Sequence, residues 1–311
     1  MIENPMDVLS LFPVRKNKKQ KADFRDAVCS YAVKLGYQVK VEDKGRGGAK
    51  NVVIGNPETA MYLVTAHYDT PAGMIISNLI TPCNFWTFIA YQLLVTGLLF
   101  AVAMVPAFVL SELGFPGDLL PTVSVIGLYF VLGMMMFGPA NPHNANDNTS
   151  GVVTVLDTAA NMPDEYRDQV CFVLFDLEEA GLIGSSLYAK MHKKEIKNQL
   201  VLNCDCCGDG DELMMFPKRK VKKNSRMLES LRGICGAGER KSIVIREKGF
   251  AYYPSDQMNF PYGVGIAAFR RSKWASLYCD KIHTKKDTVL EEENVSFLRG
   301  RLIDLISSAA E

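Results

Sequence analysis

The first feature of this 311-residue chain is a lack of charge along one long segment. No Asp, Glu, Lys, Arg or His occurs from Thr70 to Ser111, and after Glu112 and Asp118 none occurs until His143. A nearly uncharged segment of this length exceeds what the core helices of a soluble protein need. We therefore expect a membrane segment. The alternative is a soluble apolar arm that packs on a second subunit or covers an active site.

The sequence also lacks an excess of either charge. Lys and Arg number 35 and Asp and Glu 34, so the net charge of +1 gives no general attraction to nucleic acid. The basic clusters 15–21 and 217–224 contain none of the interleaved aromatic residues that a nucleic-acid surface uses. We therefore expect no nucleic-acid partner. Because both clusters would lie near a membrane, we expect them to contact anionic lipid, with 217–224 forming a solvated loop.

A disulfide framework is absent as well. The 8 cysteines follow no framework spacing, and a chain of this length can build its own core. The N-terminal residues contain no adequate apolar stretch, so we expect no signal peptide. Reduced thiols and a cytosolic-type compartment are the expectation.

Two apolar stretches occupy the uncharged segment. Residues 85–110 form a stretch of 26 residues and residues 119–137 one of 19, with a short connection between them. A hydrocarbon core of roughly 30 Å needs about 20 helical residues, so both stretches can span a lipid bilayer as a hairpin. Gln92 is the one strongly polar side chain in the first stretch, and we expect it to face the partner helix.

A hairpin returns the chain to the side from which it started. The connection carries no Lys or Arg, so all 35 lie on the flanking side. The tendency of positive residues to stay in the cytoplasm then predicts a membrane protein whose main domain lies on the cytoplasmic side.

Residues 1–81 and 140–311 are expected to form one α/β domain, into which the hairpin of residues 82–139 is inserted. Alternating strands and helices predict a mixed, mostly parallel central sheet with helices on both faces. The hydrophobic pattern places helices at 22–36, 149–161, 182–193 and 293–310, and a Gly-rich turn at 44–50. It places strands at 37–43, 51–56, 60–69, 169–176, 199–205, 211–216, 241–247 and 263–269.

Polar residues follow several of these strands. An open α/β sheet binds its ligands at the carboxyl ends of its strands. His67 and Asp69 end one strand and point the same way, and an acid beside a histidine can orient a metal-binding ring. Asp147 stands at a helix start, where an ordinary helix cap is the alternative.

Further candidates come from three later segments. Glu178 and Glu179 follow a buried strand, Asp205 follows the next one, and His283 lies in a late loop. Two histidines and several carboxylates suit zinc or a similar divalent ion. A set this rich in carboxylates is enough for two ions that share one carboxylate, with one acid left to move protons.

Six segments, in this order, resemble the co-catalytic zinc aminopeptidase family. That family includes bacterial leucyl-type aminopeptidases, glutaminyl cyclases and transferrin-receptor-like protease domains. The matching segments are AHYDT (66–70), NDNTSG (146–151), EEAGLIGS (178–185), NCD (203–205), SDQMNF (255–260) and HTKKDT (283–288).

The resemblance implies a set of metal ligands. His67 and Asp205 would bind one zinc ion, Glu179 and His283 would bind the other, and Asp147 would bridge both. Mn²⁺ and Co²⁺ are alternatives to Zn²⁺.

The resemblance also implies roles for residues beside the metals. Glu178 would be the general base, and Asp69 would support His67. Asp256 would support the site, whereas Thr284 and Asp287 would shape the loop that carries His283. A non-proline cis peptide would follow Asp147.

Two departures from the family stand out. The family usually has His where this chain has Gln257, which leaves the role of that residue open. Soluble members join the first motif to the bridging Asp by a short loop, whereas 77 residues separate Asp69 from Asp147 here. The hairpin therefore leaves and re-enters the domain beside the metals.

Near Asp205, the cysteines at 204, 206 and 207 are interpreted as small core residues, because a strand alternates its faces.

The favoured function is a membrane-anchored dizinc aminopeptidase. It would remove N-terminal residues from peptides by attack of metal-bound hydroxide, with Glu178 as the base. The alternatives are a non-catalytic scaffold or receptor-like domain, cyclisation of N-terminal Gln, and carboxypeptidase activity. Non-catalytic relatives typically lose metal ligands, whereas this chain keeps the full set. The sequence leaves homo-oligomerisation open.

Overall fold

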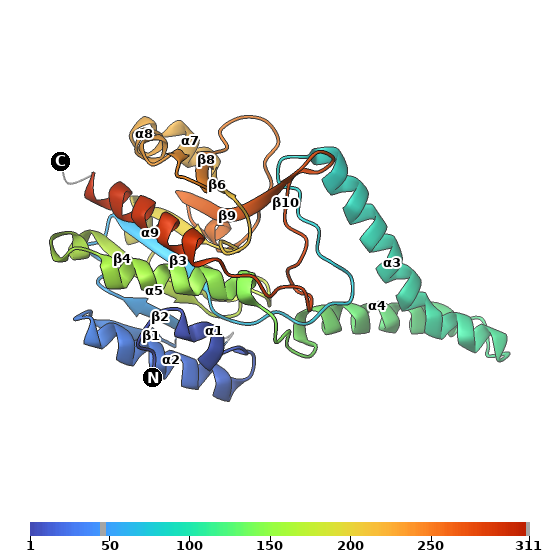
Figure 1. Ribbon diagram of the computed structural model, residues 1–311. Coiled ribbons are helices and arrows are strands. Elements are labelled where there is room, and N and C mark those ends of the chain that lie inside the picture. Colours follow the sequence, from blue (N-terminus) through green and yellow to red (C-terminus); the bar gives the residue numbers. More distant parts are fainter. Residues whose placement is uncertain (44–47, 309–311) are drawn as a thin grey trace.

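The computed structural model describes residues 1–43 and 48–308, so most of the turn expected at 44–50 lies outside the described residues. Within the described chain, ten strands form one sheet in the order β1-β2-β4-β3-β5-β9-β6-β8-β7, and β10 pairs with β9 (Figure 1). The strands are β1 (Val39–Glu42), β2 (Asn51–Ile54), β3 (Tyr62–His67), β4 (Val170–Phe175), β5 (Leu200–Cys204), β6 (Glu212–Pro217), β7 (Gly236–Ala237), β8 (Ser242–Ile245), β9 (Gly263–Ser272) and β10 (Ser276–Tyr278).

The centre of the sheet is parallel and its flanks are mixed. Strands β4, β3, β5 and β9 run parallel to one another. Strands β1 and β2 are added antiparallel on one side, and β6 is added antiparallel to β9 on the other. Every residue of β3, β4 and β5 is buried, as expected for parallel strands covered on both faces. The predicted α/β fold with a mixed sheet is confirmed.

Helices cover the two faces unequally. On one face, α2 (Lys18–Lys34), α5 (Gly151–Asn161) and α9 (Glu292–Ser307) pack over the large core. On the other, α6 (Ile183–Met191) packs over a smaller one. Alternate residues of β4 divide between the cores: Phe172 belongs to the large one, whereas Phe175 stacks on Phe260 near Tyr188 of α6. The shorter helices are α1 (Asp7–Leu11), α7 (Arg219–Lys223) and α8 (Ser225–Gly233).

Two long helices project from the body, away from both chain termini (Figure 1). They are α3 (Phe85–Glu112) and α4 (Leu120–Phe137), close to the two stretches predicted from the sequence. Both are long and apolar enough to cross a membrane. Ala103 and Ala107 are the buried residues of α3, and α4 has none. The hairpin therefore leaves very few of its apolar side chains fully buried.

Helices α3 and α4 meet through small residues. A Cβ atom added at Gly127 of α4 would collide with the backbone oxygen of Ala103 of α3. A Cβ added at Gly133, further along α4, would meet no atom within 4 Å. Small residues that let two backbones approach closely are typical of helix pairs in membranes.

The expectation for the basic cluster 15–21 is wrong for two of its residues. Arg15 is fully buried, donates from Nε to the backbone oxygen of Tyr68, and donates from Nη2 to Asn144 Oδ1. Lys21 is buried in an ion pair of 2.5 Å with Asp176. These cations satisfy acceptors inside the protein, so they are not available to lipid.

The second basic cluster also differs from expectation. Residues 217–224 do not form a loop, because strand β6 ends at Pro217 and helix α7 follows at Arg219. Val221 of α7 is fully buried and packs into the large core. The apolar residue inside the run of charges therefore fixes a helical turn.

Gly127→Ala should destabilise the hairpin, because the added methyl group has no room beside Ala103. Overpacking of this kind costs about 1–3 kcal/mol. Gly133→Ala is the matched control, since it makes the same change to helix propensity without the collision. Thermal unfolding in detergent should show a lower midpoint for Gly127→Ala than for Gly133→Ala. Equal midpoints would contradict the close approach of the two helices.

Candidate active site

Three parallel strands end at one edge of the sheet and bring the candidate residues together. His67 is the last residue of β3, Glu178 and Glu179 follow β4, and Asp205 follows β5. Because the strands are parallel and in register, their carboxyl ends lie side by side. The sheet therefore places these groups at its carboxyl edge, where α/β folds bind ligands.

Asp147 lies between the two histidines. Its Oδ1 is 3.3 Å from His67 Nε2, and its Oδ2 is 2.9 Å from His283 Nε2. Each histidine also faces a second carboxylate: His67 Nε2 is 3.8 Å from Asp205 Oδ1, and His283 Nε2 is 3.6 Å from Glu179 Oε2. The site thus contains two histidine–carboxylate pairs that share one aspartate.

The backbone around Asp147 is fixed by hydrogen bonds. The carboxylate of Asp287 accepts from the backbone nitrogens of Asn146 and Asp147, at 2.7 and 3.0 Å. The Asp147–Asn148 peptide bond is cis, as the resemblance implied. The Asn148 amide donates to the backbone oxygen of Cys204 at 3.0 Å, which ties this turn to the end of β5.

Asp69 supports two neighbouring groups at once. Its carboxylate accepts from the backbone nitrogens of Glu178 and Glu179, at 3.0 and 3.3 Å. The same carboxylate lies 3.5 Å from His67 Nδ1, a contact without hydrogen-bond geometry. Asp69 therefore links the end of β3 to the pair of glutamates that follows β4.

The charge of the site is unbalanced. Burial raises the pKa of Glu179 to about 8 and raises the pKa of Glu178 well above its usual range. Although burial opposes protonation of His283, Glu179 and Asp147 raise the pKa of that imidazole to about 9. Neighbouring carboxylates add to the effect of burial on the two glutamates and alone account for the raised pKa of His283, because too little positive charge lies among them. A bound cation would remove the imbalance.

The residues fit a divalent metal. His67, Asp147 and Glu179 offer ligand atoms that lie within 4.8 Å of one another, and so do His67, Glu178 and Asp205. In the described part of the chain, Glu179 Oε1 is buried and has no hydrogen-bond partner. Nitrogen and oxygen donors in this number suit zinc.

Sequence reasoning missed part of the pocket in which these groups lie. The cavity has a volume of about 370 Å³, and Phe88 and Gln92 of helix α3 line it together with the ionisable residues. Gln92 was expected to face α4. Cys206 is buried as expected, yet it also lines this cavity, with its Sγ 3.3 Å from Asp205 Oδ1. The contact of α3 with the body brings Phe88 and Gln92 to the cavity, and the sequence pattern does not reveal that contact.

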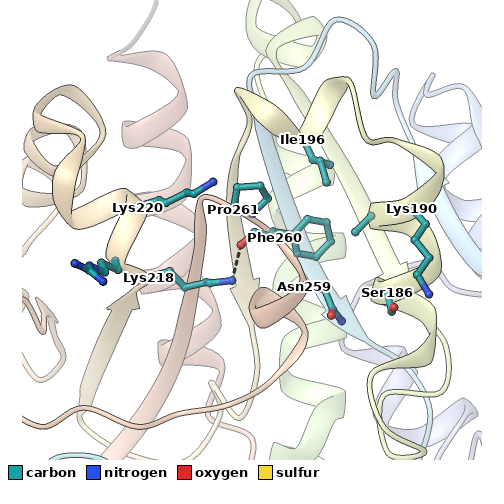
Figure 2. A pocket seen from close by; sticks show the side chains of 10 residues that line it. Ser186, Lys190, Ile196, Lys218, Lys220, Asn259, Phe260 and Pro261 are labelled. Atoms are coloured by element: carbon teal, nitrogen blue, oxygen red, sulfur yellow. Dashed lines mark hydrogen bonds between the residues drawn. The ribbon is translucent and has the colours of Figure 1, made fainter.

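A larger cavity of about 530 Å³ lies elsewhere, between α6 and α7 (Figure 2). Lys190, Lys218 and Lys220 border it, and Lys218 Nζ donates to the backbone oxygen of Phe260 at 2.8 Å. Its lining includes no carboxylate and no imidazole. It therefore lacks the ligands that zinc favours, and the smaller cavity at the sheet edge is the candidate active site.

The sequence match to a family model agrees with this site. The model of peptidase family M28 matches residues 131–299, which is more than half of the chain. The chain belongs to peptidase family M28. The match confirms the resemblance to zinc aminopeptidases and glutaminyl cyclases. The protein is therefore a zinc-dependent, peptidase-like enzyme.

Solved structures share the fold of this M28 chain. A glutaminyl cyclase of Tannerella forsythia superposes with a TM-score of 0.60 at 15% identity, over 98% of this chain and 99% of that one. An aminopeptidase of Legionella pneumophila superposes with a TM-score of 0.58 at 13% identity, over 98% of this chain and 70% of that one. A search of curated proteins gives no match. The identities are low, so these likenesses concern the fold.

Asp287→Asn should weaken zinc binding although Asp287 is not in the set of candidate ligands. The substitution leaves one acceptor oxygen where the two backbone nitrogens of Asn146 and Asp147 now find two. Loss of such a supporting group typically costs 10–100-fold in metal affinity. Competition with a chelator should show this loss, and Asp164→Asn, at a highly exposed position, should show none. Unchanged affinity in Asp287→Asn would contradict the supporting role.

Proposed function

We propose that this chain is a dizinc aminopeptidase that removes N-terminal residues from peptides. The observation that carries the proposal is the position of Asp147, whose two oxygens face two different histidines. Membership of the M28 family supports peptide hydrolysis as the reaction. Beyond the family assignment, the proposal names the number of metal ions, the general base and the bond that is cleaved, which is the first peptide bond of the substrate.

In this proposal each histidine–carboxylate pair holds one zinc ion. His67 and Asp205 would hold the first, His283 and Glu179 would hold the second, and Asp147 would contribute to both. When bound, the zinc pair polarises the scissile carbonyl and makes water acidic enough to react near neutral pH. Two further carboxylates hold the backbone of the site. Asp287 accepts from the backbone nitrogen of Asp147, and Asp69 accepts from those of Glu178 and Glu179.

Glu178 is proposed to move the proton. Its side chain lines the cavity beside His67 and Asp205, and it is not needed for either histidine–carboxylate pair. The Glu178 carboxylate takes one proton from the attacking water and returns it to the nitrogen of the leaving amine. Proton transfer by a positioned side chain typically contributes a factor of about 10²–10⁴ to the rate.

Cyclisation of an N-terminal Gln is the second candidate, because the glutaminyl cyclases of Tannerella forsythia and Porphyromonas gingivalis share the fold with TM-scores of 0.60 and 0.59. The two reactions differ in their products. Hydrolysis consumes water and releases an amino acid, whereas cyclisation releases ammonia from the peptide. A mass spectrum of products from peptides that begin with Gln or with Leu separates them.

We further propose that α3 and α4 anchor the enzyme in a bilayer. Few of their apolar side chains are buried. Such a surface suits contact with lipid, whereas a surface that faces water rarely carries so large an apolar patch. The free state of the eight cysteines and the lack of Lys and Arg in the connection support a cytoplasmic position for the body.

Glu178→Gln should abolish turnover and leave the zinc content unchanged. The amide keeps the size of the side chain but cannot accept the proton, so kcat should fall by about 10²–10⁴-fold. Glu58→Gln, at an exposed position, is the control with the same change in charge. A Glu178→Gln variant with kcat close to that of the unchanged chain would exclude Glu178 as the base.

The full chain should float with liposomes and resist extraction by alkaline carbonate, because two apolar helices would hold it in the bilayer. Flotation on a density gradient is the measurement. A full chain that stays in the soluble fraction without detergent would overturn the anchor and favour the apolar arm.

A further inference from the structure

The base of the hairpin is joined to the loop that carries His283. The chain entering the hairpin pairs with the chain leaving it, through Gly73 N to Pro139 O and Asn141 N to Pro71 O, both at 2.9 Å. The next residue, Met74, donates its backbone nitrogen to the backbone oxygen of His283 at 2.7 Å. The hairpin is therefore attached at the active site itself.

The first turns of α3 pack on a segment that also reaches the site. The rings of Phe85 and Phe250 have centroids 5.2 Å apart, and those of Phe88 and Tyr252 are 5.3 Å apart. The neighbouring Tyr253 donates its hydroxyl to the backbone oxygen of Asp205 at 3.1 Å. These contacts fix the start of α3 against the wall of the cavity.

As a result, one face of α3 lines the cavity. Phe88 and Gln92 are four residues apart, so they project from the same side of the helix. Ile80 and Ile282 line the cavity beside them. Helix α3 thus contributes an aromatic ring and an amide to a lining whose other members include the ionisable groups.

The two kinds of lining suit the two parts of a peptide end. The carboxylates and histidines suit the amine and the scissile carbonyl, which are polar. The ring of Phe88 and the side chains of Ile80 and Ile282 suit an apolar side chain. An amide such as that of Gln92 can both donate to and accept from the main chain of a peptide.

We propose that Phe88 and Gln92 are specificity-determining residues supplied by the hairpin. Phe88 selects peptides whose first residue has a large apolar side chain, and Gln92 hydrogen-bonds the peptide main chain. The inference rests on the proposed function, and it adds a substrate class and a role in recognition for α3. The hairpin is then part of the substrate site as well as an anchor.

The test measures peptide binding in the absence of turnover. The full-length Glu178→Gln variant is loaded with zinc in detergent, and the Kd values of Leu-Gly-Gly and Ala-Gly-Gly are determined by calorimetry. Phe88→Ala should weaken binding of the Leu peptide by on the order of 10-fold and change that of the Ala peptide by less than about 2-fold. Gln92→Leu should weaken both peptides by a similar factor, roughly 5–10-fold.

Two further variants guard against a displaced helix. Phe88→Leu keeps an apolar contact with Tyr252 and should bind the Leu peptide with an affinity between those of the parent and of Phe88→Ala. Leu93→Ala removes a side chain that is 69% exposed on the same helix, and it should change neither Kd. An unchanged Leu-to-Ala ratio in Phe88→Ala, or an equal change in Leu93→Ala, would overturn the inference.

Turnover by the chain with Glu178 intact separates this inference from the proposed function. Hydrolysis of Leu-Gly-Gly together with an unchanged binding ratio in Phe88→Ala overturns the role of Phe88 and leaves the aminopeptidase in place. A changed binding ratio without any hydrolysis supports the recognition surface and overturns the proposed reaction.

Discussion

Crowded carboxylates at the carboxyl edge of a parallel sheet are the constraint on which this structure depends. Asp147, Glu179 and Asp205 lie around two imidazoles, and because these side chains are largely buried, their like charges repel strongly. Burial raises the pKa of Glu179 to about 8, so this carboxyl group is largely protonated at neutral pH when no cation is bound. A bound divalent cation offsets this repulsion, because the carboxylates then bind the cation. The arrangement is therefore most stable when metal is bound.

Much of the surrounding structure holds these groups in place. Asp69 and Asp287 use their carboxylates on backbone nitrogens beside the candidate ligands. His283 has a φ of 61°, a left-handed conformation that an L-residue adopts only when its surroundings require it. In this conformation the backbone oxygen of His283 accepts a hydrogen bond from the backbone nitrogen of Met74, at the base of the hairpin. The base of the hairpin and the loop that carries His283 are thus joined directly.

The sequence predicted those features of the fold and the site that depend on the pattern of neighbouring residues. Strand β4 is a continuous apolar run and β3 and β5 are mostly apolar, so their positions and the polar residues after them could be read directly. The two apolar helices followed from length and lack of charge. Contacts between distant segments could not be predicted: Arg15 looked like a surface cation, yet it is buried against Tyr68. In the same way, Gln92 reaches the cavity because α3 docks on the body, and no pattern within the helix reveals that docking.

The central claim is that two cations occupy the cavity around Asp147. Crystals of the zinc-loaded chain, with anomalous diffraction measured at the zinc absorption edge, test it most directly. The account predicts two peaks about 3.5–4 Å apart, one beside His67 and Asp205 and the other beside His283 and Glu179, with Asp147 between them. A lone peak, or peaks away from Asp147, would contradict it.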